Sequence, residues 1–237
     1  MSLKKKNRYY FMMIYIITAL FVTYLNASAR KDSVMHPLKE LNTPIFWAEG
    51  HPGKLSRQNW EIEVTGLCKN PKTFNWEELI SLPKTTVPAR LTSVTQWSVF
   101  GHWGGIKLSD ILNLVEADSA VKYVRFWSHR MIYDTSIPIE IAKNEKTLLA
   151  YDFNDVYLSE DYGGPVRVFC PYLWGYKSAK SVVKIELMNH YVPGFWETRG
   201  YTDSAEIEPT MIYDVNDNNK PKWNDGGNEV IFDGDGK

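Results

Sequence analysis

Alternation of hydrophobic and polar side chains along the chain predicts mostly β-strands. Trp60, Ile62 and Val64 alternate with polar residues, which is the period of a strand with one buried face. By contrast, we expect residues 98–105, rich in glycine and aromatic side chains, to form a loop. Patterns of the same kind predict further strands at 86–95, 121–127, 133–137, 148–153, 166–170 and 181–188.

Helix signals are few and short. Asn75 and Glu78 have the spacing of a capping box, which predicts a helix beginning there. Ser109 is expected to cap a second helix over 110–115, and Pro138 to open a third. Strands that dominate over short intervening helices predict an α+β fold with mixed β-sheets.

Residues 1–29 have the pattern of a secretory signal peptide. Residues 4–8 carry four positive charges, residues 9–25 carry none, and Ala27-Ser28-Ala29 forms a small-residue cleavage site. The alternative is an uncleaved N-terminal anchor, because a membrane span needs roughly 17–25 residues. Either way, we expect an exported protein, periplasmic or anchored and facing outside the cytoplasm. Paired arginines, which mark export of prefolded proteins, do not precede the apolar run.

Charge is spread unevenly along the rest of the chain. Residues 201–237 contain nine acidic and three basic side chains, although the whole chain has a net charge of only -1. We therefore divide the chain into the signal, a domain over 30–205 and an acidic C-terminal extension over 206–237. We expect that extension to be wrapped or loose and to lie outside the core. Nucleic acid is not an expected partner, since phosphate binding needs a clustered positive face.

The two cysteines, Cys68 and Cys170, leave two possibilities open. An exported protein could form one disulfide from them. However, Cys170 ends an apolar run, which favours a buried thiol in the core.

Four clusters contain residue types that bind ligands. Residues 162–167 (Tyr-Gly-Gly-Pro-Val-Arg) and 177–180 (Lys-Ser-Ala-Lys) combine cations with small residues, which suits a phosphate-bearing ligand. Taken alone, the first is more often just a turn, and the second is more often a solvated start of a strand. Aromatic and hydroxyl side chains form the other two clusters, at 46–51 and 92–105.

In this order, these motifs resemble the molybdopterin-dependent oxidoreductases of the sulfite oxidase fold, which include bacterial methionine sulfoxide reductase catalytic subunits. The resemblance covers about residues 46–201. It implies an α+β, sulfite oxidase-like fold, a Mo-molybdopterin cofactor and redox chemistry such as oxygen-atom transfer. Further matching motifs are Trp97-Ser98, Trp103-Gly104-Gly105-Ile106, Thr147-Leu148-Leu149-Ala150-Tyr151 and the run from Pro193 to Tyr201.

The resemblance also implies which residues contact the cofactor. Arg167 matches an arginine that contacts the pterin or its phosphate, and residues 178–180 match the segment that wraps the pterin tail. Tyr162 stands where relatives often carry Asn or His. The complete implied set is His51, Ser128, Tyr162, Arg167, Ser178, Ala179 and Lys180.

One position departs from the family pattern. The family places a molybdenum-ligating Cys four residues before the Trp of the Trp-Ser pair, and here that residue is Ser93. A thiolate forms near neutral pH, whereas a serine alkoxide is harder and far more basic, so the metal would have to drive its deprotonation. Ser93 is therefore the candidate catalytic residue and metal ligand, or a bystander.

Three functional hypotheses remain open. The first is an exported oxidoreductase that acts on a small-molecule substrate, with a possible membrane or haem redox partner. The second is a cofactor-free pseudoenzyme of the same fold that serves as a binding or partner protein. The third is a hydrolase with Ser93 as nucleophile and His102 or His129 as base, although Ser93 lies in no G-x-S-x-G turn.

Overall fold

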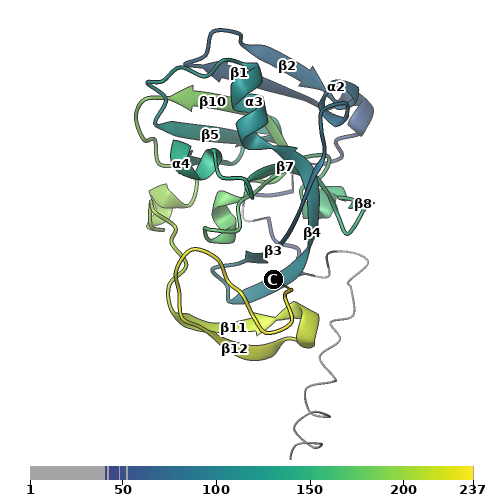
Figure 1. Cartoon of the computed structure of the whole chain (residues 1–237), viewed down its shortest axis with the longest axis vertical. Coiled ribbons are helices and arrows are strands. Elements are labelled where there is room, and N and C mark those ends of the chain that lie inside the picture. Colours follow the sequence, from purple (N-terminus) through teal and green to yellow (C-terminus); the bar gives the residue numbers. More distant parts are fainter. Residues whose placement is uncertain (1–40, 42, 48, 52, 237) are drawn as a thin grey trace, which may run out of the picture. The chain divides into compact units, whose positions relative to one another are not determined.

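The computed structural model describes residues 41, 43–47, 49–51 and 53–236. Within these residues, one five-stranded and one seven-stranded sheet are joined by short helices (Figure 1). This is the predicted α+β fold with mixed sheets. The predicted signal or anchor, residues 1–29, lies outside the described residues. Across the part of the chain that is described, helices are too short or too polar to cross a membrane.

The smaller sheet has the strand order β2-β1-β10-β5-β6. Its β1–β10 pair is parallel and its other pairs are antiparallel. Ile62 and Val64 of β1 are buried and their neighbours face outward, as the alternation predicted. The strands are β1 (Glu61–Gly66), β2 (Lys72–Asn75), β5 (Tyr123–Ser128), β6 (Asp134–Pro138) and β10 (Val182–Met188).

The larger sheet follows the order β12-β11-β4-β7-β8, with β3 paired to β4 and β9 paired to β7. All six residues of β7 are buried, so this strand lies at the centre of the molecule. The strands are β3 (Thr85–Thr92), β4 (Trp97–Lys107), β7 (Leu148–Phe153), β8 (Val156–Tyr157), β9 (Arg167–Phe169), β11 (Thr210–Asp214) and β12 (Lys220–Asn224).

The helices are short, and one begins earlier than expected. In α2 (Trp76–Ile80) the predicted capping box is confirmed. The expected cap of α3 (Leu108–Leu114) is wrong: Lys107 is the N-cap residue and Ser109 lies inside the helix. The backbone N–H of buried Leu108 donates to the Thr147 carbonyl at 3.0 Å. This N–H group at the start of the helix is therefore satisfied without a side-chain cap at Ser109.

The remaining helical segments are α4 and the 3-10 turns. Pro138 is the N-cap residue of α4 (Ile139–Ala142). The 3-10 turns are η1 (Arg57–Asn59), η2 (His129–Met131), η3 (Glu160–Tyr162), η4 (Gly175–Lys177), η5 (Glu197–Arg199) and η6 (Val215–Asp217).

The expected loop at 98–105 is wrong, because these residues form most of β4. Its glycines allow close packing rather than a turn. A Cβ atom on Gly101 would lie 2.1 Å from the Phe153 ring, and one on Gly104 would lie 2.2 Å from the Asp152 carboxylate. Glycine in a strand interior often marks such a close approach.

The cysteine geometry favours the buried-thiol expectation. Both cysteines are free, and Cys170 is fully buried. Burial raises the pKa of the Cys170 thiol to about 12, which keeps it protonated and unreactive at neutral pH.

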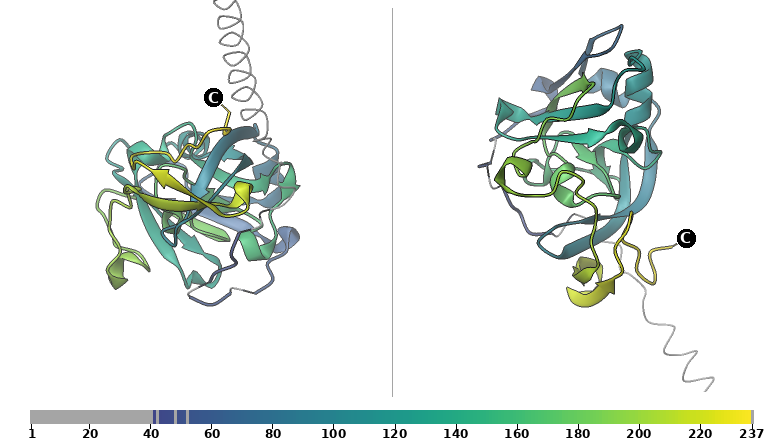
Figure 2. Two further views of the ribbon diagram at one scale, coloured as in Figure 1. Left: turned by 90° about the horizontal axis from the view of Figure 1, so that it is seen from below. Right: turned by 90° about the vertical axis from the view of Figure 1, so that its left-hand side faces the viewer.

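The acidic extension belongs to the larger sheet, contrary to the expectation that it lies outside the core. Strand β11 pairs in parallel with β4, and β12 completes a hairpin that Figures 1 and 2 show in yellow. Ile212, Val230 and Phe232 are buried in the main hydrophobic cluster. The acids of this segment therefore have structural partners, which a charge count does not reveal.

Buried Arg90 on β3 joins this segment to the sheet. Its guanidinium donates to Asp214 at 2.9 Å and to Asp235 at 2.7 Å, and the three side chains are almost inaccessible. Phe232 packs against the guanidinium at 4.4 Å from the ring centre.

Replacing Asp235 with Ala should destabilise the protein by about 3 kcal/mol, because Arg90 would lose one of its two buried counter-charges. Urea denaturation measures the change. Asp233→Ala, at an exposed position two residues earlier, is the matched control and should change stability little. Equal losses in the two variants would contradict this role for Arg90.

Candidate functional site

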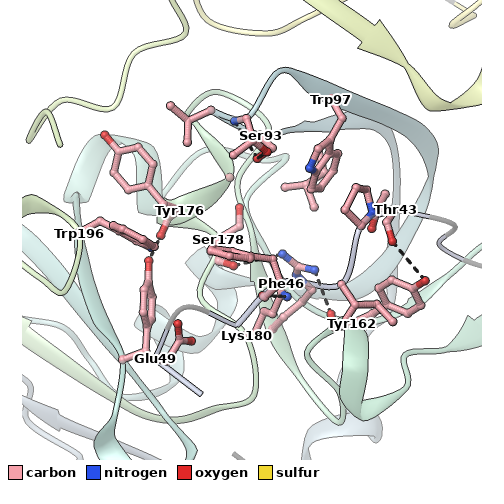
Figure 3. Close-up of a pocket in the computed structure, with 18 of the residues that line it drawn as sticks. Thr43, Phe46, Glu49, Ser93, Trp97, Tyr162, Tyr176, Ser178, Lys180 and Trp196 are labelled. Carbon is pink, nitrogen blue, oxygen red and sulfur yellow. Dashed lines mark hydrogen bonds between the residues drawn. The ribbon is translucent and has the colours of Figure 1, made fainter. Parts of the chain in front are cut away.

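A pocket of about 260 Å³ is built from segments that are far apart in the sequence. Residues 43–47 are here called the N-terminal strap. Residues 43–46 of the strap form one wall of the pocket, and the turn between β3 and β4 forms another. Residues around η3, β9 and η4 complete it, as the close-up in Figure 3 shows. Much of the lining is aromatic and includes Phe46, Trp97, Tyr133, Tyr162, Tyr176, Trp196 and Tyr201.

Ser93 reaches the pocket on a tight turn. Its backbone N–H donates to Trp97 at 2.8 Å, and its carbonyl accepts from Gln96 at 2.9 Å. The hydroxyl lies 2.8 Å from that of Thr95 and accepts the Thr95 backbone N–H at 3.2 Å. Ser93 and Thr95 thus present two hydroxyl groups on the same wall of the pocket.

Arg167 enters the pocket from β9 and is almost completely buried. Its guanidinium donates to the carbonyls of Tyr162 at 2.9 Å and Ser178 at 3.2 Å, which fixes its position. Burial lowers the pKa of Arg167 to about 10. The group remains charged at neutral pH, and it is held where few water molecules can solvate it.

Lys180 lies on the same side of the pocket and holds the strap. Its ammonium donates to the Phe46 carbonyl at 2.9 Å and lies 4.4 Å from the centre of the Trp47 ring. Glycine at position 163 makes room for the lysine stem, since a Cβ there would lie 2.8 Å from Lys180 Cβ. Gly163 also has φ +94°, a conformation that other residues rarely adopt.

Arg167 and Lys180 are both positively charged groups in a pocket that excludes much of the water, so they repel one another. Burial, followed by repulsion from Arg167, lowers the pKa of Lys180 to about 7, while Glu49 and Asp161 partly oppose this change. Burial also raises the pKa of Glu49 on the pocket wall, partly offset by a backbone hydrogen bond and by Lys180. A ligand with negative charge would relieve the repulsion between the cations.

The structure brings five of the predicted site residues to this pocket: Ser93, Tyr162, Arg167, Ser178 and Lys180. Ala179 is buried beside them, and its carbonyl accepts the Val168 N–H at 2.8 Å. The other two, His51 and Ser128, do not line the pocket. His51 Nε2 lies 3.4 Å from Asp161 Oδ1, and the Ser128 hydroxyl accepts the Tyr133 backbone N–H at 3.1 Å. The cofactor roles of all these residues stay predictions.

Several pocket residues were missed by sequence reasoning. Glu49 and Trp97 fall in motifs quoted above, so their positions carried a signal, but their side chains were not singled out. Nothing in the sequence marked Tyr133 and Tyr176 as pocket residues, because they come together only in the folded chain. There the Tyr133 hydroxyl donates to the Tyr176 carbonyl.

Lys177, the first cation of the Lys-Ser-Ala-Lys motif, points away from the pocket and has a structural role. Its fully buried ammonium pairs with Glu197 and donates to the Ser136 carbonyl at 3.0 Å. Glu197 also accepts the Thr135 hydroxyl at 2.7 Å. This buried pair ties η4, β6 and η5 together and thereby positions Tyr176 and Trp196 on the pocket wall.

The geometry does not support the hydrolase hypothesis. Among the described residues, the Ser93 hydroxyl is hydrogen-bonded to Thr95. His102 and His129, the two candidate bases, do not line the pocket. The arrangement of a nucleophile beside a base is therefore not present around Ser93.

Fold and pocket together define an α+β protein with an aromatic-lined pocket that contains Arg167 and Lys180. Comparison with known proteins narrows this class. Residues 48–196 match the model of the oxidoreductase molybdopterin binding domain, and the chain belongs to this family. The fold is the sulfite oxidase-like one that the resemblance implied.

Curated relatives agree with this assignment. The chain is 30% identical to a putative protein-methionine-sulfoxide reductase subunit, YedZ1, of Azospira oryzae, covering 66% of this chain and 59% of the relative. It is 28% identical to the protein-methionine-sulfoxide reductase catalytic subunit MsrP of Ralstonia nicotianae, over 73% and 56%. The chain thus spans little more than half the length of these relatives.

Two further comparisons extend the range of similar proteins. The chain is 30% identical to the uncharacterized oxidoreductase YuiH of Bacillus subtilis, covering 67% of this chain and 80% of that protein. The crystal structure of the sulfane dehydrogenase SoxCD from Paracoccus pantotrophus has a TM-score of 0.57 at 18% identity, over 74% of this chain and 47% of that one. At this identity, the similarity to SoxCD supports the fold alone.

The two lysines of the Lys-Ser-Ala-Lys motif should respond oppositely to substitution by Met. Lys177→Met should cost about 3–5 kcal/mol, because Glu197 would remain buried without its counter-charge. Lys180→Met should leave stability at neutral pH unchanged or raise it, because burial and Arg167 disfavour the Lys180 ammonium. Chemical denaturation of both variants measures the contrast, and a larger loss in Lys180→Met would contradict it.

Proposed function

We propose that this protein binds a molybdopterin-type cofactor in the pocket between the strap and the β3–β4 turn and acts as an exported oxidoreductase. The observation that carries the proposal is the pair of desolvated cations, Arg167 and Lys180, in an aromatic-walled pocket of a molybdopterin-binding domain. Such a pocket has the charge and the walls that a phosphate-bearing aromatic heterocycle requires.

The residues present fit the organic part of the cofactor. Arg167 and Lys180 would hold the phosphate, and Ser178 lines the pocket beside them. Tyr162 and Trp97 supply flat surfaces for a ring system. When bound, a molybdenum centre would supply oxygen-atom transfer or related redox chemistry.

At the position where the family carries the thiolate that binds molybdenum, this chain carries hydroxyl groups. Ser93 and Thr95 line that wall, and neither Cys68 nor Cys170 lines the pocket. Ser93 is accordingly the proposed ligand and catalytic residue. Its hydroxyl proton would have to leave to solvent on coordination, and the Thr95 hydroxyl, 2.8 Å away, could then donate a hydrogen bond to the Ser93 oxygen.

Substrate and partner are proposed from the relatives. Two of them are named for protein-methionine-sulfoxide reductase, so an oxidised thioether in a protein or a small molecule is the proposed substrate class. A membrane or haem protein is the proposed electron partner. Export rests on the pattern of residues 1–29, with its basic start and uncharged apolar run.

Purification from the native envelope tests the proposal directly. We expect about one pterin per chain by fluorescence after oxidation, together with molybdenum by elemental analysis. Pterin without molybdenum would overturn the proposed redox chemistry but retain the binding site. Absence of both, in cells that make the cofactor, would overturn the function as a whole.

Ser93→Cys should raise the molybdenum content, because a thiolate would then stand at the family's ligand position. Thr95→Cys is the matched control, since it adds a thiol to the same wall of the pocket two residues away. An equal rise in both variants, or a rise in neither, would count against a metal position at residue 93.

Affinity for a phosphate-bearing pterin should fall as the pH rises from about 7 to about 9. The free protein loses the Lys180 charge above its pKa of about 7, whereas the pKa of Arg167 is about 10. The loss should be at most about tenfold per pH unit, the limit for one coupled proton. Calorimetry at several pH values measures the slope, and the same slope in Lys180→Met would contradict this assignment.

A further inference from the structure

The strap and the pocket share a single cation. The Lys180 ammonium lines the pocket and also donates to the Phe46 carbonyl at 2.9 Å. An ammonium carries three N–H donors, and this contact uses one of them. The other donors are available to an anionic ligand, so a single group can hold the ligand and the strap together.

Within the part of the chain that the structure describes, few hydrogen bonds join the strap to the rest of the domain. Besides Lys180, the Tyr162 hydroxyl donates to the Thr43 carbonyl at 3.5 Å, which is long for a hydrogen bond. The Trp47 Nε1 atom is buried and has no hydrogen-bond partner among the described residues. Ile45 and Phe46 are 54% and 63% exposed, and Phe46 stacks on one side against Trp196 with ring centres 6.5 Å apart. Among the described residues, the Lys180 contact is therefore the shortest hydrogen bond that ties residues 43–47 to a distant part of the domain.

We propose that Lys180 is a latch that couples occupancy of the pocket by an anionic ligand to closure of the strap. An anion beside Lys180 keeps the ammonium charged, and a charged donor makes a stronger hydrogen bond to the Phe46 carbonyl. With the pocket empty, burial and repulsion from Arg167 disfavour the charged form of Lys180, which weakens its hydrogen bond to the Phe46 carbonyl. Ligand binding thus tightens the strap over the pocket. The identity of the ligand rests on the proposed function, whereas the latch itself rests on the contacts of Lys180.

Limited chymotrypsin digestion tests the latch, because Phe46 and Trp47 are cleavage sites within the strap. Cleavage that requires local opening tracks the population of the open form. Loss of one charge-assisted hydrogen bond in Lys180→Met should speed cleavage at Phe46 and Trp47 about tenfold in the ligand-free protein. Lys184→Met is the matched control, because Lys184 lies on β10 and pairs with Glu63 at 3.4 Å. Mass spectrometry of the products locates the cut.

The digestion is then repeated with three ligands added in turn: a phosphate-bearing pterin, the same pterin without phosphate, and inorganic phosphate. The phosphate-bearing pterin should slow cleavage of the strap in the wild type and in Lys184→Met, but not in Lys180→Met. The unphosphorylated pterin should give little protection. Inorganic phosphate should give protection at high concentration, because it supplies the anion alone.

The outcomes separate the latch from the function. If calorimetry detects binding of the phosphate-bearing pterin but cleavage of the strap is unchanged, the latch is wrong and the proposed function stands. If Lys180→Met is cleaved at the wild-type rate without ligand, the latch is also wrong. If the pterin fails to bind while Lys180→Met is cleaved faster, the tether is real and the proposed function fails.

Discussion

The placement of Arg167 beside Lys180 is the constraint on which the site depends. Two positive groups that have lost most of their water repel one another, and the guanidinium is held by backbone carbonyls and by the ring of Trp103. A protein keeps such an arrangement only when the surrounding structure fixes it. Here the fixing elements are β9, the glycine loop before it and the segment after η4, all of which are anchored in the two sheets.

Buried ion pairs outside the pocket supply that rigidity. The Lys177–Glu197 pair ties three pocket-forming segments together, and Arg90 ties the C-terminal hairpin to β3 next to the Ser93 turn. Three buried cations therefore differ in whether a buried carboxylate accompanies them. Arg90 and Lys177 are paired with buried carboxylates, whereas among the described residues Arg167 donates to backbone carbonyls.

Sequence reasoning predicted the elements whose pattern is local and missed those set by tertiary contacts. The strand around Ile62 and the capping box at Asn75 are encoded by neighbouring residues, and both are confirmed. Strand β4 was missed because its glycines make room for the side chains of Phe153 and Asp152, which lie some fifty residues away in the sequence. The family motifs led to Arg167 and Lys180, but the counter-charges that separate Lys177 from Lys180 are visible only in the fold.

The pocket draws its walls from Thr43 through Tyr201, so no shorter piece of the chain contains it. Its assembly must follow folding of both sheets, because β1 pairs with β10 and β3 leads into the turn that carries Ser93. A chain threaded through a membrane in extended form would therefore arrive on the far side without its ligand. For such a chain, the supply of ligand in the destination compartment, and not in the compartment of synthesis, would decide whether the pocket is filled.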